Sequence, residues 1–453
     1  MNASGSRNMT VGSPAGHIIT FALPLLAGNF LQQLYNMVDS WVVGQYVGDS
    51  ALAAVGIAFP VMFMFNAIFI GLSTGGTVVI AQFFGAGKTD RVRDAIDTIY
   101  AAFLLVVIPI SVIAIAVMKP LLTAMQVDPA AFDEAWLYLV VVCAGLIGTI
   151  GYNLNAGILS GLGNSRTTLL FLSIAALLNI VLDLAFVLLF HLGVLGVALA
   201  TIMAQAVSWL FGLFYINRRY PAFAIRLTRL RLDRALLGQI VSIGLPAALQ
   251  MSLVSISSVV VMGKINSFGE AYSAGFNVGL KLDQLAFLPV QSLSTAAMSF
   301  VGQNTGANLP NRVRQGIRLT VIASAVWSLL MAAILVPTAP ALVAVFSDTP
   351  AVINAGVTYI RCIMPFYAAF GVMYAMNDAL RGAGASMLPL AVNIVNLLLI
   401  RTPLMYWLAD HWGPDYMHYS SGIGWVAGAV LAVVYYLSGR WQKRGSLAES
   451  LLT

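Results

Sequence analysis

Long apolar segments alternate with short polar segments along nearly the whole chain. A transmembrane helix needs about 20 mostly apolar residues to cross the hydrocarbon core of a bilayer. Twelve segments meet this requirement, and they lie near residues 17–38, 53–76, 97–118, 135–157, 168–190, 194–216, 236–262, 272–298, 317–338, 352–378, 387–408 and 423–439. The pattern predicts an all-α membrane protein with twelve transmembrane helices.

The composition agrees with this prediction and excludes a water-soluble fold. Of the 453 residues, 60% are hydrophobic and only 9% are charged, whereas a soluble domain carries about 25% charged residues. Twelve spans would occupy roughly 240 residues, which leaves no room for a large appended ATPase domain. Residues 1–16 are polar and small, and the first apolar stretch is too long for a cleavable signal peptide, so we expect it to be the first span.

The basic residues predict the orientation of the chain, because Lys and Arg are enriched in cytoplasmic loops. If the N-terminus lies in the cytoplasm, 18 of the 23 Lys and Arg residues fall on that side, six of them within residues 217–235. We therefore expect a multi-pass protein of the plasma (inner) membrane with both termini in the cytoplasm. This arrangement accounts for the net charge of +6 without a nucleic-acid partner.

The two halves of the chain repeat each other, with matching motifs in the same order and at a nearly constant offset. The matching pairs are Ala22-Leu23-Pro24 with Gly244-Leu245-Pro246, Leu72-Ser73-Thr74 with Leu293-Ser294-Thr295, Gln82-x-x-Gly85-Ala86 with Gln303-x-x-Gly306-Ala307, Arg91-Val92-Arg93 with Arg312-Val313-Arg314, Asn155 with Asn377, and Gly161-x-Gly163 with Gly382-x-Gly384. Six spans separate equivalent points, so both halves face the same way. A parallel repeat of this kind predicts two six-helix lobes related by a pseudo-twofold axis.

The repeat also predicts the domain boundaries. We expect a cytoplasmic N-terminal segment 1–16, an N-lobe 17–216 with spans 1–6, a basic cytoplasmic linker 217–235, a C-lobe 236–439 with spans 7–12, and a cytoplasmic tail 440–453. Pro24 lies inside the first span, where it removes a helix hydrogen bond and provides a hinge.

Several residue patterns suggest chemistry that their surroundings do not support. Residues 85–89, Gly-Ala-Gly-Lys-Thr, look like the end of a phosphate-binding loop, but Gln82 replaces the required glycine and an apolar span precedes the segment. We interpret it as a cytoplasmic turn and expect no nucleotide. Cys143 and Cys362 are expected to be free thiols packed in helices. The four histidines, His17, His191, His411 and His418, are expected to be polar residues at the membrane interface.

Acids at membrane depth are costly and often mark ion or proton pathways. Asp39 follows Tyr35 by four residues and Asp183 follows Asn179 by four, so each acid shares a helix face with its neighbour. Two carboxylates, a carboxamide and a hydroxyl could form an oxygen cage for a small hard cation. The two acids could instead share a proton, because like charges close together disfavour ionisation. A structural hydrogen bond between helices is a third interpretation.

Two further acids lie in the second half. Asp283 is two residues from Lys281 and therefore not on the same helix face, so its alternatives are a salt bridge to another helix or a place in a substrate cavity. Asp378 lies near Arg381 at the inner end of its span, and we expect it to be structural.

Taken together, these motifs resemble the multidrug and toxic compound extrusion (MATE) family. The resemblance rests on Leu-Pro in spans one and seven, Tyr35-Asn36-x-x-Asp39, Gln82-x-x-Gly-Ala, and Leu380-Arg381-Gly382-x-Gly384, and it covers about residues 15–440. The chain looks similar to the branch related to the DNA-damage-inducible proteins. The resemblance implies a cation site, for H⁺ or Na⁺, at Asp39, Asn179, Asp183 and Thr201, with Tyr35, Tyr138 and Asn155 around the same cavity. The chain lacks the acid that another branch carries on span seven.

The resemblance implies a secondary active multidrug efflux transporter rather than an enzyme. It would export amphipathic, often cationic organic compounds by antiport with H⁺ and/or Na⁺, with alternating access between the two lobes. A flippase for lipid-linked intermediates of the same superfamily is the alternative. We expect no cofactor beyond the coupling ion, small-molecule drugs or metabolites and the lipid bilayer as partners, and a monomer.

Overall fold

The computed structural model describes residues 6–444, apart from the side chains of Asp49, Phe59, Pro60, Met64, Lys443 and Arg444. Every regular element in this part of the chain is a helix. The elements are α1 (Pro14–Tyr46), α2 (Asp49–Gly85), α3 (Thr89–Ala124), α4 (Pro129–Ala144), α5 (Leu146–Gly161), α6 (Ser165–Leu184), η1 (Ala185–Leu189), α7 (Gly193–Arg219), η2 (Pro221–Phe223), α8 (Arg234–Asn266), α9 (Glu270–Gly306), α10 (Pro310–Ala344), α11 (Pro350–Ile363), η3 (Met364–Phe366), α12 (Tyr367–Gly382), α13 (Met387–Asn393), η4 (Ile394–Arg401), α14 (Thr402–Trp412), η5 (Pro414–His418), α15 (Tyr419–Leu437) and η6 (Arg440–Arg444).

The helices confirm the predicted all-α membrane fold. Within residues 6–444, 11 helices are long and apolar enough to cross a membrane, or up to 12 if the bent pair α4 and α5 forms one span. The helix direction bends by 51° between α4 and α5. The break falls at Gly145, where an added Cβ would meet the side chain of Ile202 on α7. A side chain on α7 therefore occupies the space inside the bend.

The chain forms two compact units whose boundaries fall inside helices. Unit 1 comprises Met1–Asn8 and Leu23–Ala248, and unit 2 comprises Met9–Ala22 and Leu249–Thr453. The divisions therefore lie beside Pro24 in α1 and shortly after Pro246 in α8, where proline interrupts the backbone hydrogen bonds. The lobe boundaries expected from the sequence, 17–216 and 236–439, stay a prediction.

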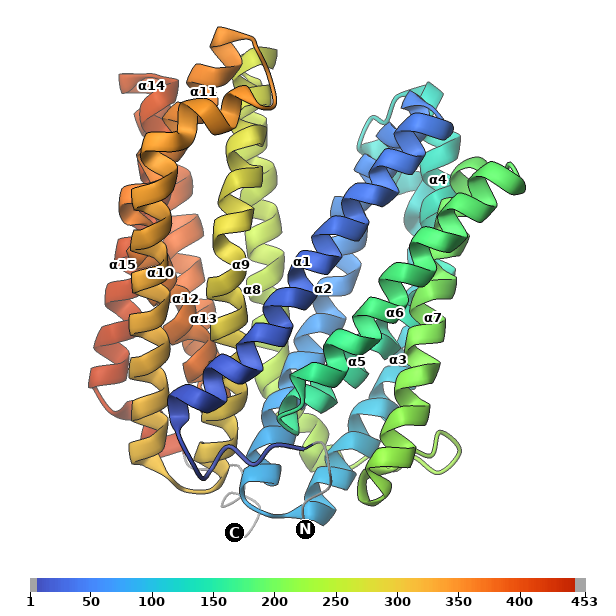
Figure 1. Cartoon of the computed structure of the whole chain (residues 1–453), viewed down its shortest axis with the longest axis vertical. Coiled ribbons are helices and arrows are strands. Elements are labelled where there is room, and N and C mark those ends of the chain that lie inside the picture. Colours follow the sequence, from blue (N-terminus) through green and yellow to red (C-terminus); the bar gives the residue numbers. More distant parts are fainter. Residues whose placement is uncertain (1–5, 445–453) are drawn as a thin grey trace. The chain divides into compact units, whose positions relative to one another are not determined.

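In unit 1, α2 packs against α3, α4 and α5, and α6 packs against α7 (Figure 1). Close helix contact depends on glycine where α2 meets the first part of α8. A Cβ added at Gly75 would lie 3.0 Å from the backbone nitrogen of Gly244, and one at Gly71 would lie 2.8 Å from that of Ala248. The spacing of Gly71 and Gly75 thus permits backbone-to-backbone contact, as small residues do in membrane helices.

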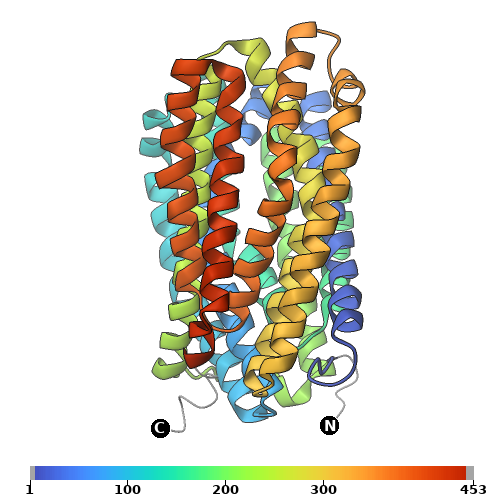
Figure 2. The same ribbon diagram turned by 90° about the vertical axis from the view of Figure 1, so that its left-hand side faces the viewer.

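In unit 2, α9 packs against α10, α11 and α12, and α12 also contacts α15 (Figure 1). Residues 9–13, which directly precede α1, belong to this unit, and the backbone nitrogen of Met9 donates to Gln303 Oε1 at 2.9 Å. Figure 2 shows the start of α1 and the end of α15 at the same end of the unit. The start of α1 and the end of α15 therefore lie on one side of unit 2, and the cytoplasmic location of the termini stays a prediction.

The structure bears on three minor expectations. Residues 85–89 form the predicted turn, because α2 ends at Gly85, Gly87 has φ +71°, and α3 begins at Thr89. Cys143 and Cys362 are free and buried, as expected. Two of the four histidines are buried inside the protein. His418 is 4% exposed and stacks on Phe276 with 5.7 Å between ring centroids, and His17 is 8% exposed; their position at the membrane interface stays a prediction.

Burial of these histidines has a physical reason. The ring nitrogen His418 Nε2 lies 2.9 Å from the hydroxyl of Tyr272, and His17 Nε2 lies 2.6 Å from the carbonyl oxygen of Val11. A polar ring can enter an apolar environment when its nitrogen has such a partner. The partners lie on other segments, so the sequence pattern alone did not indicate them.

Candidate functional site

Helices α1 and α6 bring the two acids of the first half together within unit 1. The carboxyl groups of Asp39 on α1 and Asp183 on α6 lie within hydrogen-bonding reach of each other. Asp183 is 0% exposed and Asp39 is half-buried. No Lys or Arg forms an ion pair with either acid among the described residues. Two carboxyl groups this close together, one of them fully buried, repel each other unless a proton or a cation is bound.

Two tyrosines surround the acidic pair. Tyr35 lies one helical turn before Asp39 and is close to both acids, and Tyr138 on α4 is close to the same three residues. The hydroxyl of Tyr138 is within hydrogen-bonding reach of Thr201 on α7. Thr201 Oγ1 donates to the carbonyl oxygen of Val197 at 3.0 Å, so its hydroxyl proton is engaged. The oxygen of Thr201 can still accept a hydrogen bond or contact a cation.

Asn179 completes this group of polar side chains. It lies one turn before Asp183 on α6 and is 3% exposed. Its carboxamide oxygen and nitrogen have no hydrogen-bond partner among the described residues, and both carboxylate oxygens of Asp183 and Oδ1 of Asp39 lack a conventional donor. Buried polar atoms usually have partners. These oxygens would suit a small hard cation or a proton.

The chemistry of this donor set limits which ion would fit. Carboxylate, carboxamide and hydroxyl oxygens favour hard cations, not the soft metals that thiolate or imidazole ligands select. Within residues 6–444, no group of three or more His, Cys, Asp and Glu side chains is placed to hold a metal ion. The set of Asp39, Asn179, Asp183 and Thr201 therefore fits Na⁺ or H⁺ by type of atom. Their role in cation binding stays a prediction.

Asn155 connects three helices of unit 1. It is fully buried on α5, where Tyr100 of α3 donates to its Oδ1 and its Nδ2 donates to the carbonyl oxygen of Trp209 on α7 at 2.9 Å. Both ends of the carboxamide are thus used to connect helices. The structure therefore gives Asn155 a helix-bridging position, and its place around the cavity stays a prediction.

Asp283 lies on α9 in unit 2, where two tyrosines hold it. Tyr359 donates to its Oδ2 at 3.0 Å, and Tyr367 donates to its backbone carbonyl oxygen at 3.1 Å. Among the described residues Asp283 forms no salt bridge within 4 Å, which removes one of the two alternatives that its sequence left open. Its place in a substrate cavity stays a prediction.

Asp378 is structural, as expected. Arg381 Nη1 donates to Asp378 Oδ1 at 2.6 Å, and Arg381 Nη2 donates to Gln250 Oε1 at 2.5 Å. The guanidinium therefore joins α12 to α8 within unit 2 and neutralises the acid.

The sequence did not single out two polar neighbours of Tyr35. Gln32, three residues earlier on α1, is within hydrogen-bonding reach of the Tyr35 hydroxyl, and Tyr152 on α5 lies close to the same group. Gln32 could have been identified from its spacing on the helix. Tyr152 could not, because only the packing of α5 places it there.

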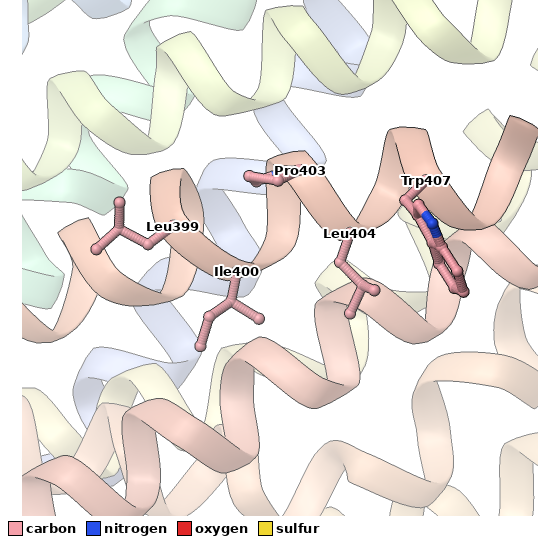
Figure 3. A pocket seen from close by; sticks show the side chains of 5 residues that line it. All are labelled: Leu399, Ile400, Pro403, Leu404 and Trp407. Carbon is pink, nitrogen blue, oxygen red and sulfur yellow. The ribbon is translucent and has the colours of Figure 1, made fainter.

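A groove on the outer surface of η4 and α14 is not part of this site. It has a volume of about 540 Å³ and is lined by Leu399, Ile400, Pro403, Leu404 and Trp407 (Figure 3). All five residues are apolar, and Leu399 and Trp407 are exposed. Such a surface suits contact with lipid chains rather than recognition of a charged ion.

Comparison with known families supports the repeat and the fold. A family model named MatE matches the chain twice, at residues 24–185 and at residues 246–407. The chain belongs to the MatE family. The two matches begin at Pro24 and Pro246, which the repeat pairs with each other, and they have the same length. This agreement confirms the internal repeat and the resemblance to this family.

Relatives of the chain are similar over almost its whole length. The probable multidrug resistance protein YpnP of Bacillus subtilis is 28% identical over 436 residues, which are 96% of this chain and 97% of that protein. The probable multidrug resistance protein NorM of Thermotoga maritima is 26% identical over 446 residues, with 95% and 94% covered. A solved structure described as the outward-facing conformation of a multidrug resistance MATE family transporter of the MOP superfamily has a TM-score of 0.88 at 24% identity, covering 97% of this chain and 98% of that one. This likeness shows a shared fold.

Proposed function

We propose that the protein is a secondary active multidrug efflux transporter of the plasma (inner) membrane, with both termini in the cytoplasm. It exports amphipathic, often cationic organic compounds in exchange for H⁺ and/or Na⁺. Membership of the MatE family and the names of the relatives support export of such compounds. The observation that carries the coupling mechanism is the buried contact between Asp39 and Asp183, which lack a basic partner. A site of this kind resembles that of the DNA-damage-inducible branch.

The acidic pair couples drug export to the ion gradient because its negative charge must be neutralised. Burial and mutual repulsion penalise the doubly ionised pair, so it takes up a proton or Na⁺ from the outer side. Asp39 lies on α1, the helix in which Pro24 marks the boundary between the two units. Ion binding favours a different bend of α1, for which Pro24 is the weak point. The new bend disfavours the bound drug, which leaves to the outside, and this population shift makes the process an antiport.

Two lobes of parallel orientation are suited to alternating access, in which one half rocks against the other around a fixed site. Neutral or cationic compounds fit the acidic pair better than an anionic lipid-linked head group does. This charge preference favours an exporter over a flippase.

Reconstituted protein tests the proposal. Purified protein in liposomes with an imposed pH or Na⁺ gradient should move a cationic dye uphill, and Asp39→Asn should reduce this movement to the level of protein-free liposomes. Asp94→Asn is the matched control, because it makes the same chemical change at an exposed acid of unit 1. Uphill transport by Asp39→Asn at the wild-type rate would place the coupling site elsewhere.

A further inference from the structure

The basic linker, residues 217–235, forms a loop between α7 and α8 that exposes many positive charges within unit 1. Figure 1 shows this loop beside the lower end of α7. Six arginines lie in the linker, and all of them are exposed: Arg218, Arg219, Arg226, Arg229, Arg231 and Arg234. None of the six forms an ion pair within 4 Å among the described residues. Their charges are therefore open to a partner that is not part of unit 1.

The one acid of the linker, Asp233, is used elsewhere. Its Oδ1 accepts hydrogen bonds from the backbone nitrogens of Ala235 at 2.8 Å and Leu236 at 3.2 Å, in the first turn of α8. Its Oδ2 lies 3.5 Å from Arg91 Nη1 on α3. Asp233 thus caps α8, as aspartate often does at the start of a helix, and does not neutralise the arginines of the loop.

Hydrogen bonds give the linker a fixed shape. The side chain of Asn217 on α7 accepts from the backbone nitrogen of Ile225 at 2.6 Å and donates to the carbonyl oxygen of the same residue at 3.0 Å. Phe223 and Ile225 are buried and anchor this part of the loop. In the turn that follows, the backbone nitrogen of Arg229 donates to the carbonyl oxygen of Arg226 at 2.8 Å. The exposed turn therefore projects from a fixed base.

Apolar side chains are exposed between these arginines. Leu227 is 40% exposed and Leu232 is 37% exposed. The loop joins two helices that are long and apolar enough to cross a membrane, so it stays near the bilayer surface. Exposed leucine beside arginine is typical of segments that lie in the membrane interface, where the apolar side chains enter the lipid chains. The orientation of the protein accounts for the arginines but not for the exposed leucines.

We propose that the basic linker binds anionic phospholipids of the adjacent leaflet, with the lipid phosphate on Arg226 and Arg229 and with Leu227 among the acyl chains. A guanidinium can donate two parallel hydrogen bonds to a phosphate, and the anionic membrane surface attracts each arginine in addition. Arg231 contributes less, because Asp97 on α3 is near enough to compensate its charge. The proposal goes beyond the function proposed above and does not depend on drug export. A bound lipid would hold the adjoining ends of α7 and α8 at the membrane surface.

Lipid binding to purified protein in a neutral detergent tests the proposal. Native mass spectrometry gives the dissociation constant of the first bound lipid, for phosphatidylglycerol and for phosphatidylcholine with the same acyl chains. The wild type should bind phosphatidylglycerol more tightly. Arg226→Gln with Arg229→Gln should weaken this binding by at least about tenfold, because each arginine near an anionic surface contributes roughly fivefold. Binding of zwitterionic phosphatidylcholine should change less.

Arg318→Gln with Arg440→Gln is the matched control. It removes the same number of charges from exposed arginines of unit 2, on the side of the membrane where the linker is expected. Binding of phosphatidylglycerol by this variant should stay near the wild-type value. An equal loss in both double variants would mean that only net charge matters, and would overturn the proposal. Equal affinity of the wild type for the two lipids would also overturn it and would leave the arginines to an acidic protein partner.

A free anion distinguishes a lipid site from a phosphate site. Glycerol 3-phosphate carries a phosphate group without acyl chains, so at equal concentration it should not displace phosphatidylglycerol from the wild type. Leu227→Ser keeps the arginines but removes an apolar contact, and it should weaken binding of the lipid. Displacement by glycerol 3-phosphate, or unchanged lipid binding in Leu227→Ser, would contradict the lipid proposal.

The position of the loop at a bilayer gives an independent readout. Thr228 is exposed in the turn, and Thr228→Cys can carry a fluorophore because Cys143 and Cys362 are buried. In nanodiscs, the neutral quencher acrylamide should reach this fluorophore less well when phosphatidylglycerol is present than in phosphatidylcholine alone. The difference should disappear when Arg226→Gln and Arg229→Gln are added. Equal quenching in the two lipid compositions with the arginines intact would show that the loop does not engage the anionic surface.

Discussion

The two units carry different residues at corresponding positions of one repeated scaffold. At the offsets of 221 and 222 residues that relate the paired motifs, Asp39 falls at Val260 or Val261 and Asp183 at Leu404 or Met405. Val261 and Met405 belong to one apolar core cluster of unit 2, just as Asp39 and Asp183 lie together in unit 1. The same helix positions therefore meet in both units, but only unit 1 places ionisable groups there.

The two deep acids of unit 2 lie elsewhere. Asp378 is paired with Arg381, whereas Asp283 accepts a hydrogen bond from Tyr359 and forms no ion pair among the described residues. A buried acid that already has a cationic partner gains little from taking up an external cation. The difference teaches that an acid at membrane depth indicates ion exchange only when the fold leaves it without a counter-charge. On this basis we propose unit 1 as the ion-exchanging half.

The largest expected effect comes from neutralising the acidic pair. Asp183→Asn should abolish ion-driven dye efflux in liposomes while the protein remains folded, because removing one of two repelling charges does not destabilise the site. Met405→Leu is the corresponding change in unit 2. It conserves volume in an apolar core and should leave efflux near the wild-type rate. Equal loss of efflux in Asp183→Asn and Met405→Leu would mean that the two units do not differ in their contribution to ion coupling.

The combined variant sharpens this test. Asp39→Asn with Asp183→Asn should be no worse than either single change, because residues that act as one unit are not additive. Residual transport in both single variants that disappears only in the double variant would show two independent sites.

A smaller effect, on stability rather than coupling, is expected at the neutralised acid of unit 2. Arg381→Gln removes the partner of buried Asp378 and should lower the free energy of unfolding by about 3–5 kcal/mol. Adding Asp378→Asn should recover much of this loss, because it removes the unpaired charge. The measurement is chemical denaturation of the purified protein. An unchanged free energy of unfolding in Arg381→Gln would show that the ion pair does not stabilise the packing of α12.

The smallest effect is expected at an ion pair of which only the acid is exposed. Lys264 Nζ lies 2.7 Å from Asp410 Oδ1, but the Asp410 side chain is 57% exposed. Solvent screens such pairs, so Lys264→Gln should change the free energy of unfolding by less than about 1 kcal/mol. Denaturation under the same conditions as for Arg381→Gln provides the comparison, and an equal loss in both variants would contradict the role assigned to burial.

The fold could be predicted almost completely from the sequence, because the length of the apolar segments, the positions of basic residues and the repeat are visible in a single chain. The sequence also indicated Asp39 and Asp183 as candidate residues of an ion site, because each follows a polar side chain, Tyr35 or Asn179, by four residues and so shares its helix face. The positions of Asn155 and His418 could not be derived in this way. Their hydrogen-bond partners, such as Tyr100 for Asn155, come from other helices and become neighbours only through packing.

Ion release on drug binding tests the central claim most directly. When a cationic dye is added to purified, weakly buffered protein, the wild type should release protons, detected with a pH-sensitive dye, or Na⁺, detected with a Na⁺ electrode. Asp39→Asn and Asp183→Asn should release neither, while Asp283→Asn should release as much as the wild type. Full release by Asp39→Asn, or loss of release in Asp283→Asn alone, would contradict the account and assign ion exchange to unit 2.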